Sequence, residues 1–498
     1  MLYPPTHYCM QPDCPRDTLL RCKDPPRSVS LFTFEQGVLD AFSIHLYCCR
    51  SNYHHNYVVR NGTRVYYEGV PQFIQVSEHK FIAQPVLALF TSLALFSWTS
   101  ATNAAQIYNS TLSHLHNPQY SQARHRLRTE HVWDGFVINA LLKDARDRCY
   151  VLRVLHTGDQ KDRFTNAMQA RNDHMNRSGQ PEFLHCCTRC VRLIPQPDGS
   201  TAYIDVAVTD GIEMGRPCCG VRNCTEALLS TQDRYCPSHT YLSNQCVIAG
   251  CSDCAEAGFR TCADPVHRQV ESWHILHGKA MFTLRHALLH AHNTSGGNGE
   301  DTSGDGPCTE KPDVTNRSMK AVFTRRRTHN EQIILRPCGI ILKRATFYGS
   351  EAVSQVLKLF RTTYPNKELM PRAIFYDNNC HLWKHSRAIG ETFHEEVGLP
   401  VDVFHWKSKH KKADVVCSMH CNPYAYPELR TDNDEWFFNS SIAEQNNVWA
   451  GGYAPIIREM TAIKHDFFLD EMVKEKNALT RSRLESAGCR PGYRPVPY

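Results

Sequence analysis

The sequence predicts an α/β protein whose core is interrupted by a cysteine-rich, zinc-binding insertion. Close pairs of cysteine and histidine recur between residues 218 and 267. Strand-like and helix-like segments alternate after residue 330, and acidic residues follow two of the strand-like runs, at Asp210 and Asp377. In α/β proteins the functional residues commonly lie at the carboxyl ends of the strands, so the same observations predict a functional site.

The composition is that of a globular protein with room for several domains. The chain has 498 residues, of which 42% are hydrophobic and 10% aromatic, and this excludes a disordered protein. The formal net charge of +6 permits a nucleic-acid partner without demanding one. The 23 cysteines are odd in number and follow no secretion signal, which indicates metal ligation in a reducing compartment.

One uncharged stretch, residues 85–105, imitates a membrane span. Its dense apolar part ends at Trp98 and covers about 14 residues, fewer than the roughly 20 that a spanning helix needs. We therefore expect a buried helix here and no membrane partner.

The central cysteines form two consecutive units of three cysteines and one histidine. Zinc takes four nitrogen or sulfur ligands in a tetrahedron, and two close pairs separated by a short excursion supply them from one loop. A site with four protein ligands leaves no position for water, so these zinc ions would be structural. The predicted ligands are Cys219, Cys224, Cys236 and His239 in the first unit, and Cys246, Cys251, Cys262 and His267 in the second.

Cysteines beside these units leave alternatives open. Cys218 and Cys254 could each replace a neighbouring ligand. Upstream, His185, Cys187 and Cys190 offer three further ligands, and Cys218 could complete a third zinc site with them.

The N-terminal region carries a further cluster. Cys9 and Cys14 form a first pair that needs a second one. Cys48 and Cys49 are adjacent, so they are not expected to bind the same zinc ion together. The remaining candidates to complete this site are Cys22, His45, His54 and His55.

The segments outside the zinc units follow an ordered series. Residues 201–211 predict a first strand, ending at Asp210, and residues 265–292 predict a helix with a histidine-rich polar face. Residues 293–314 form a Gly-, Ser- and Asp-rich linker that cannot bury a core, and we expect it to be disordered. The series then continues with strands at 331–337 and 339–349, a helix at 350–364, a strand ending at Asp377, a helix to about 397, a strand at 401–406 and a helix carrying Glu444.

This series is the element order of a ribonuclease-H-like core. In that topology the first and fourth strands are parallel neighbours, which brings Asp210 and Asp377 together, and Glu444 completes an acidic triad from a later helix. Two divalent cations held by such carboxylates activate the attacking oxygen and stabilise the leaving oxygen in phosphodiester cleavage. The sequence therefore predicts a magnesium- or manganese-dependent phosphoryl-transfer site.

Each acid also has a purely structural interpretation. Asp377 could be a turn residue, and Asp210 stands before a glycine, as turn residues do. Asp205, inside the same strand, is the rival first acid. Glu444 lies three residues after Ser441, which fits a capping box at a helix start. The joint placement of the acids in topological order favours the triad.

The expected domain boundaries follow these patterns. Residues 1–79 form an N-terminal cysteine cluster, 80–185 a mainly helical region, 186–215 the first core strand with its preceding cysteines, 216–292 the zinc-binding insertion and helix, 293–314 the linker, 315–480 the remainder of the core, and 481–498 a tail.

Several motifs together resemble the KDZ (Kyakuja–Dileera–Zisupton) transposase-like proteins of fungi, which carry associated cysteine clusters. The motifs are "LYCCRSNYHHNY", "SWTSATNAA", "VTDGIEMGRPCCGVRNC", "YDNNCHLW", "FHWKSKHKKADVVCSMHCNP" and "FNSSIAEQNNVWAGGY", and the likeness spans most of residues 3–480. The resemblance implies a DDE-type transposase with a ribonuclease-H fold, two divalent metals and a DNA substrate. It implies the catalytic acids Asp210, Asp377 and Glu444, a Cys-x2-His motif at Cys417 and His420, and an aromatic residue after the glutamate at Trp449.

Two basic runs could contact DNA phosphates or act as nuclear localisation signals. The first comprises Arg325, Arg326 and Arg327, and the second comprises Lys407, Lys409, Lys411 and Lys412. We expect a nuclear protein whose partner is DNA, with a homo-oligomer left open. Two functions of different classes remain: a DNA strand-transfer enzyme, or a catalytically inactive, host-retained zinc protein that binds DNA or a protein partner.

Overall fold

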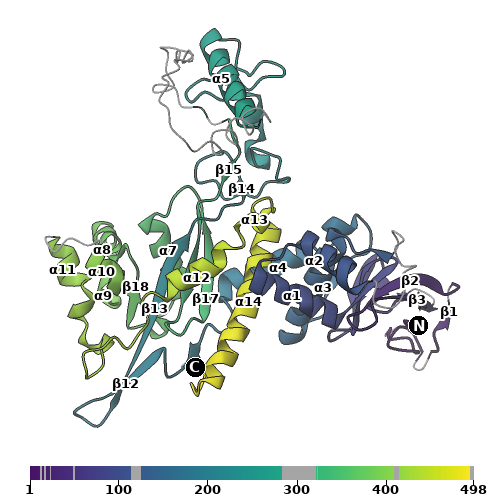
Figure 1. The fold of residues 1–498 in the computed structure, drawn as a ribbon, viewed down its shortest axis with the longest axis horizontal. Coiled ribbons are helices and arrows are strands. Elements are labelled where there is room, and N and C mark those ends of the chain that lie inside the picture. Colours follow the sequence, from purple (N-terminus) through teal and green to yellow (C-terminus); the bar gives the residue numbers. More distant parts are fainter. Residues whose placement is uncertain are drawn as a thin grey trace, which may run out of the picture. The chain divides into compact units, whose positions relative to one another are not determined.

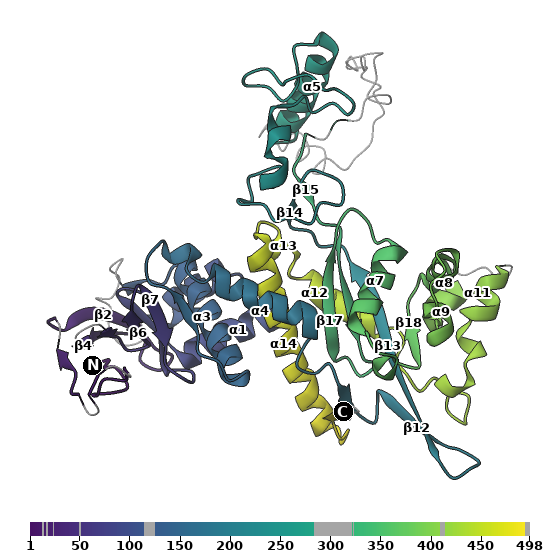
Figure 2. The ribbon, with the colours of Figure 1, turned by 180° about the vertical axis from the view of Figure 1, so that it is seen from behind.

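The computed structural model describes residues 1–11, 14–15, 18–22, 24–48, 51–113, 125–282, 321, 323–408 and 414–493. The predicted linker, 293–314, lies outside these residues. The chain divides into two compact units: Met1–Arg216 together with His329–Tyr498, and Pro217–Thr328. Figures 1 and 2 show their elements from two sides.

The N-terminal part of the first unit is built from two sheets. The first has the order β1–β4–β5–β6–β7–β10, with antiparallel neighbours, and the second has the order β3–β2–β9–β8, in which β2 and β9 are parallel. Their bounds are β1 Arg21–Cys22, β2 Arg27–Phe32, β3 Val38–Ser43, β4 Leu46–Cys48, β5 Ser51–Tyr53, β6 Tyr57–Arg60, β7 Thr63–Tyr66, β8 Phe73–Ser77, β9 Lys80–Ala83 and β10 Arg153–Leu155.

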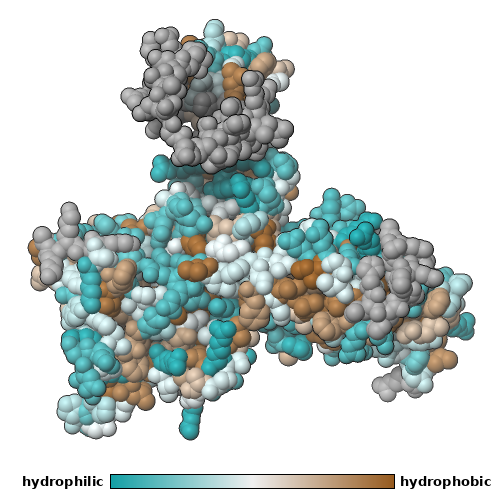
Figure 3. Space-filling model, viewed as in Figure 1, coloured by the Kyte–Doolittle hydropathy of each residue, from teal (hydrophilic) through white to brown (hydrophobic). Residues whose placement is uncertain are grey.

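Four helices pack beside these sheets: α1 (Gln84–Ser97), α2 (Ala101–Ile107), α3 (Thr129–Asp147) and α4 (Thr165–Ser178). α1 is the helix expected from the uncharged stretch, and it buries Val86, Leu87 and Phe90 in the local core while Phe96 stays exposed. Hydrophobic surface lies over α1 on the face that Figure 3 shows. No helix among the described residues is long and apolar enough to cross a membrane.

A long helix, α14 (Ala462–Ser486), connects this part with the central sheet (Figure 1). It packs along α4, where Arg171 of α4 and Glu471 of α14 form a buried ion pair of 2.8 Å. On its other side Val473 joins the core of the central sheet. Phe467 of the same helix packs in the core of the N-terminal part, so α14 contributes to the cores of both parts.

The central sheet comprises β12 (Val191–Pro195), β13 (Thr201–Ile212), β16 (Asn330–Leu335), β17 (Ile341–Phe347) and β18 (Ala373–Phe375). The order is β12–β13–β16–β17, with antiparallel neighbours, and β18 pairs with β13 in parallel. The strands predicted at 201–211, 331–337 and 339–349 agree with β13, β16 and β17.

Alternate residues of these strands face two different cores. Ala207, Ile334 and Ile374 pack with α7 (Val353–Thr363) and α8 (Asn379–Ala388) on one face. Val208 and Phe375 pack with α12 (Ile442–Gly451) and α14 on the other. The shorter elements of this unit are β11 His185–Cys186, α9 Phe393–Glu396, α10 Val403–Ser408, α11 Val415–His420, α13 Ala454–Ile457, β19 Gly492–Tyr493, and the π or 3-10 segments Tyr108–Leu112, Gln160–Asp162, Lys367–Leu369, Pro423–Ala425 and Pro427–Leu429.

Two expected elements differ from the structure. The segment 401–406, predicted as a strand, is a helix from Val403 because the Asp402 carboxylate accepts hydrogen bonds from the amides of Phe404 and His405 and so starts α10. Residues 398–400 lie beside β18 instead, where Ile374 N–H donates to Gly398 O at 2.9 Å. The helix predicted from Ser350 begins at Val353.

The second unit has little regular structure. β14 (Pro217–Cys218) and β15 (Arg326–Arg327) pair antiparallel where the chain enters and leaves it. Between them lie cysteine-rich loops, a 3-10 segment at Pro237–Asn244 and α5 (Pro265–Phe282). Its two small cores form around the cysteines themselves.

Candidate functional site

Asp210 and Asp377 lie at the carboxyl ends of two neighbouring parallel strands. In the pairing of β13 with β18, Val206 is opposite Ala373 and Val208 is opposite Phe375. Each aspartate lies two residues beyond that last pair. Because side chains alternate along a strand, Asp210 projects from the same face as Val208. Asp210 is inside β13, paired with Ile333, and is therefore not a turn residue.

Glu444 reaches the same end of the sheet from α12, the helix that covers this face. It forms no capping box, because the Ser441 hydroxyl donates to Asp402 Oδ2 at 3.0 Å instead. Glu444 Oε1 lies 3.2 Å from His405 Nε2, while His405 Nδ1 lies 2.9 Å from Asp377 Oδ1. One buried imidazole thus connects the second and third predicted acids.

The electrostatics of this region reflect crowded negative charge. Burial, together with the charges of Asp377, Glu351 and Glu444, raises the pKa of Asp210 to about 7. Asn447, one helical turn after Glu444, donates to Asp210 Oδ2 at 2.8 Å. A bound cation would offset the repulsion among these carboxylates, and their oxygens are the ligand type that Mg²⁺ and Mn²⁺ prefer.

Glycine is required next to Asp210. A Cβ at Gly211 would lie 2.1 Å from Asn330 Nδ2 and 2.7 Å from Gln332 Oε1. The glycine predicted to mark a turn instead lets two neighbouring side chains approach the strand.

Three further members of this site, His405, Asp402 and Asn447, were not predicted from the sequence. His405 Nδ1 also lies 3.2 Å from Asp402 Oδ1, and Asp377, Asp402 and His405 form a group whose ligand atoms lie within 4.8 Å of one another. The one available signal was the spacing of Glu444 and Asn447, which lie three residues apart on one face of the predicted helix. Asp402 and His405 lie in a segment predicted as a strand, so their spacing gave no such signal.

The rival first acid, Asp205, has a different role. Its carboxylate lies 2.8 Å from the guanidinium of Arg336, and both side chains are almost fully buried. Asp205 is near the start of β13, five residues before Asp210, and its charge is already compensated. Asp205 is thus part of a structural ion pair, whereas Asp210 accepts a hydrogen bond from Asn447 of α12.

The two motifs that the family resemblance implies each connect a helix to a neighbouring one. Cys417 forms a disulfide with Cys380, and His420 stacks on Trp383 with ring centroids 4.3 Å apart, so the Cys-x2-His motif joins α11 to α8. Trp449 joins α12 to the N-terminal helices, where its Nε1 donates to Leu95 O at 3.2 Å.

In the second unit the structure brings together both predicted quartets, each with its ligand atoms within 4.8 Å of one another. Within them Cys224 and Cys236 sulfurs lie 3.7 Å apart, and Cys251 and Cys262 sulfurs 3.9 Å apart. A tetrahedral zinc with Zn–S bonds of about 2.3 Å places its sulfurs roughly 3.8 Å apart. The quartets are therefore compatible with zinc. The alternates Cys218 and Cys254 join neither group.

Two further clusters lie in the first unit. Cys9, Cys14 and Cys48 form one, with Cys14 and Cys48 sulfurs 3.1 Å apart. The His45 and His54 rings contact each other at a tilt of 58°, with centroids 4.3 Å apart, and are not part of this cluster. Cys49 lies outside the described residues. The other comprises His185, Cys187, Cys190 and Cys338. Its fourth member is Cys338 and not the candidate Cys218, which is in β14 of the other unit.

The basic runs are only partly described. Arg325 and Arg326 donate to the backbone oxygens of Thr231 and Gly220, and Arg327 lies with Arg326 in β15. Arg325 and Arg326 therefore form hydrogen bonds within the second unit. Lys407 is exposed at the end of α10, whereas Lys409, Lys411 and Lys412 lie outside the described residues.

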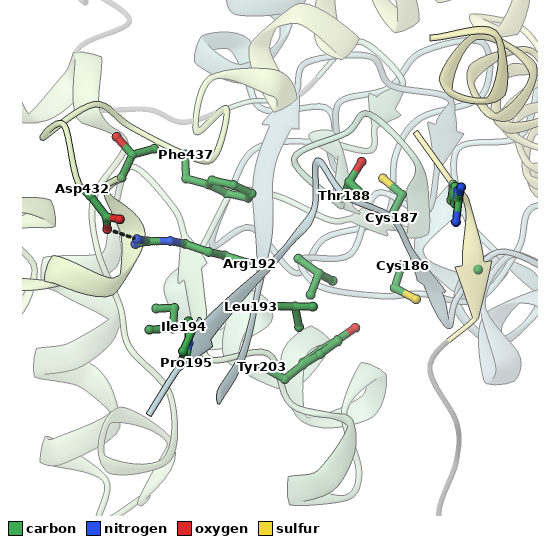
Figure 4. Close-up of a pocket in the computed structure, with 14 residues that line it drawn as sticks. Cys186, Cys187, Thr188, Arg192, Leu193, Ile194, Pro195, Tyr203, Asp432 and Phe437 are labelled. Atoms are coloured by element: carbon green, nitrogen blue, oxygen red, sulfur yellow. Dashed lines mark hydrogen bonds and ion pairs between the residues drawn. The ribbon is translucent and has the colours of Figure 1, made fainter. Parts of the chain in front are cut away.

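A pocket of about 600 Å³ lies away from the acids, between β12, β13 and the loop that carries Asp432 and Phe437 (Figure 4). Arg192 crosses it and pairs with Asp432 at 3.0 Å. None of Asp210, Asp377 and Glu444 lines it.

Comparison with known families identifies both cysteine-rich regions. The model of a CxC5 like cysteine cluster associated with KDZ transposases matches residues 1–112. The model of a CxC6 like cysteine cluster associated with KDZ transposases matches residues 208–273, which include Asp210 and both quartets. The resemblance to KDZ transposase-like proteins is confirmed. No curated protein and no solved structure matches the chain.

Proposed function

We propose that this KDZ transposase-like protein is a DDE-type enzyme that cleaves DNA phosphodiesters and transfers the strands. The observation that carries the proposal is the placement of Asp210 and Asp377 at equivalent positions of parallel neighbours, with Glu444 delivered by the helix over the same face. The strand order β17–β16–β13–β18, with only the last pair parallel, supports a ribonuclease-H-like core.

In this proposal the three carboxylates hold two divalent cations. Magnesium or manganese bound there would activate the attacking oxygen and stabilise the leaving oxygen of the phosphodiester. Asp210 and Asp377 supply oxygens from the rigid sheet, which fixes their separation, and Glu444 supplies one from α12. Phosphoryl transfer needs positioned charge rather than a covalent nucleophile, and this acidic site satisfies that need.

His405 is a positioning residue in this scheme. Its ring nitrogens contact Asp377 and Glu444. Asp402 Oδ1 also contacts the ring at Nδ1 and accepts a hydrogen bond from the His405 amide at the start of α10, which fixes the ring. Asp377 and Glu444 have side-chain exposures of 29% and 46%, so they remain reachable from solvent while His405 is buried.

The zinc quartets of the second unit serve the fold. Four protein ligands leave no open coordination position, so zinc would stabilise loops that have little other core. Glu271 supports the second quartet by accepting hydrogen bonds from the amides of Arg260 and Thr261, beside Cys262.

The alternative, a catalytically inactive zinc protein that binds DNA or a partner, is favoured by one observation. The carboxylates of Asp377 and Glu444 already contact His405, so the group is held together without a cation.

Asp377→Asn tests the proposal against this alternative. The full chain should bind Mn²⁺ in addition to its zinc and nick or join DNA in a Mn²⁺- or Mg²⁺-dependent manner. Asp377→Asn should lower that activity by at least about 100-fold, because each positioned charge contributes several kcal/mol to the transition state. Asp198→Asn, at an exposed turn, is the control. A wild-type chain that binds no Mn²⁺ and leaves DNA intact would rule out the enzyme.

A further inference from the structure

Four ligand-type side chains gather in the first unit, separate from the acids and from both quartets. They are His185, Cys187, Cys190 and Cys338, and their ligand atoms all lie within 4.8 Å of one another. The first three come from β11 and the turn after it. Cys338 comes from the turn between β16 and β17, almost 150 residues later in the chain.

The burial of this group indicates a ligand rather than packed free thiols. His185, Cys187 and Cys190 are 1%, 5% and 0% exposed. His185 Nε2 is buried without a hydrogen-bond partner. Leaving a buried polar atom unsatisfied costs about 1–3 kcal/mol, so a buried imidazole with an unsatisfied nitrogen in a group of three thiols needs an explanation.

The local backbone is arranged for thiolate. Cys187 N–H donates to Cys190 Sγ at 3.1 Å, and the Cys190 amide in turn bonds to Cys187 O at 3.0 Å. This tight turn places both sulfurs of the Cys-x2-Cys pair on one side, as zinc loops require. An amide that donates to sulfur stabilises the negative charge that a metal-bound thiolate carries.

We propose that His185, Cys187, Cys190 and Cys338 hold a structural zinc ion that clamps the β16–β17 turn to the start of β12. The ligand set, three sulfurs and one nitrogen, is that of the two quartets in the other unit. All four coordination positions are filled by protein, so the ion stabilises the fold and does not activate water.

The clamp acts on the strand that carries Asp210. Cys190 immediately precedes β12, whose first residue pairs with Asp205 of β13. On the other side, Cys338 is two residues after Arg336, whose guanidinium lies 2.8 Å from the Asp205 carboxylate. One zinc ion would therefore join the two segments that contact β13 at Asp205, which lies five residues before Asp210.

Cys186 offers a matched control. It stands between two of the ligands but belongs to no cluster among the described residues. In Figure 4 the sulfurs of Cys186 and Cys187 point to opposite sides of the chain, as expected for neighbours in an extended segment.

The experiment compares the zinc content of the full wild-type chain with that of Cys338→Ser and Cys186→Ser. Cys338→Ser should lose one zinc per chain and Cys186→Ser none, measured by elemental analysis of folded protein. An unchanged zinc count in Cys338→Ser would overturn the proposal.

A measurement on the wild-type chain covers the case in which Cys338→Ser fails to fold. Cys421 is fully buried and belongs to no cluster of the described residues, so it serves as a protected reference thiol. Alkylation during brief chelation should label Cys187, Cys190 and Cys338 as zinc leaves, ahead of Cys421. If these thiols stay as protected as Cys421 after all zinc has left, burial alone protects them and the proposal fails.

Discussion

Asp210 and Asp377 each lie two residues beyond the last registered pair of β13 and β18, Val208 and Phe375, so they occupy equivalent positions on parallel neighbours. The equivalence follows from the order of elements along the chain. β18 runs parallel to β13, and a parallel strand can be reached only through a crossover connection. The helix α7, which precedes β18 in the chain, forms this connection. Both carboxylates thereby reach the same edge of the sheet.

Asp205, five residues before Asp210, fixes β13 through its buried ion pair with Arg336. We predict that Asp205→Asn destabilises the protein by roughly 3 kcal/mol, because it leaves the buried Arg336 without its charge partner. The urea concentration at the unfolding midpoint measures the effect. Asp198→Asn, at an exposed turn between β12 and β13, should leave the midpoint unchanged, and an equal shift in both variants would contradict the role given to Asp205.

The raised pKa of Asp210 makes stability depend on pH. Its folded pKa of about 7 lies above the ordinary value near 4, so its contribution to stability is complete below pH 4 and is lost as the pH rises through 7. Asp210→Asn should therefore stabilise the protein at pH 8 without added Mg²⁺ or Mn²⁺, by about 1–2 kcal/mol after allowance for partial exposure. Thermal unfolding at pH 5 and pH 8 measures this difference.

Metal binding to Asp210→Asn tests the same charge repulsion. Mn²⁺ at pH 8 should raise the unfolding temperature of the wild-type chain and leave that of Asp210→Asn unchanged. A wild-type midpoint that does not differ between the two pH values would contradict the electrostatic account of Asp210.

The local patterns of the sequence were sufficient for some of these features. Both quartets could be predicted because all their ligands lie within short loops, where spacing alone limits the geometry. The strands β16 and β17 could be predicted because each is a continuous apolar run. The placement of Asp377 beside β13 followed from the order of elements rather than from any single residue.

Long-range contacts explain what the sequence did not reveal. Cys338 joins His185 only because the β16–β17 turn folds back on β11, and no spacing rule relates positions so far apart. The segment at 401–406 alternates apolar and polar residues as a strand does. The Asp402 carboxylate nevertheless starts a helix there, and this local hydrogen bonding outweighs the alternation. Because His405 lies in this segment, its contact with Asp377 was not predicted from the sequence.

The first quartet offers a test confined to the second unit. We predict that Cys236→Ser releases one zinc ion per chain, because Cys236 contacts His239 Nδ1 at 3.0 Å and has no exposed surface. The second quartet should keep its zinc, since the two groups share no ligand. Cys254→Ser removes an exposed thiol that belongs to neither group and should leave the zinc content unchanged. Elemental analysis that finds equal zinc in all three proteins would refute zinc binding at the first quartet.

Two tryptophans, Trp98 and Trp449, fix the position of α12 and with it that of Glu444. Trp98 Nε1 donates to Trp449 O at 2.8 Å, while Trp449 Nε1 donates to Leu95 O, so the end of α1 and the end of α12 bond reciprocally. The Trp98 ring rests directly on Gly452, where an added Cβ would lie 2.3 Å from it. Gly452→Ala must therefore displace the ring, and overpacking of this kind costs about 1–3 kcal/mol.

Because α12 carries both Glu444 and Asn447, displacement of Trp98 should shift these side chains relative to Asp210. We expect Gly452→Ala to lower Mn²⁺-dependent DNA cleavage by about tenfold or more while zinc content stays at the wild-type value. Val448→Ala, on the exposed side of the same helix, is the control and should retain activity. Crystallographic or hydrogen-exchange data that show α12 unmoved in Gly452→Ala, with full activity, would mean that the tryptophan contact does not position Glu444.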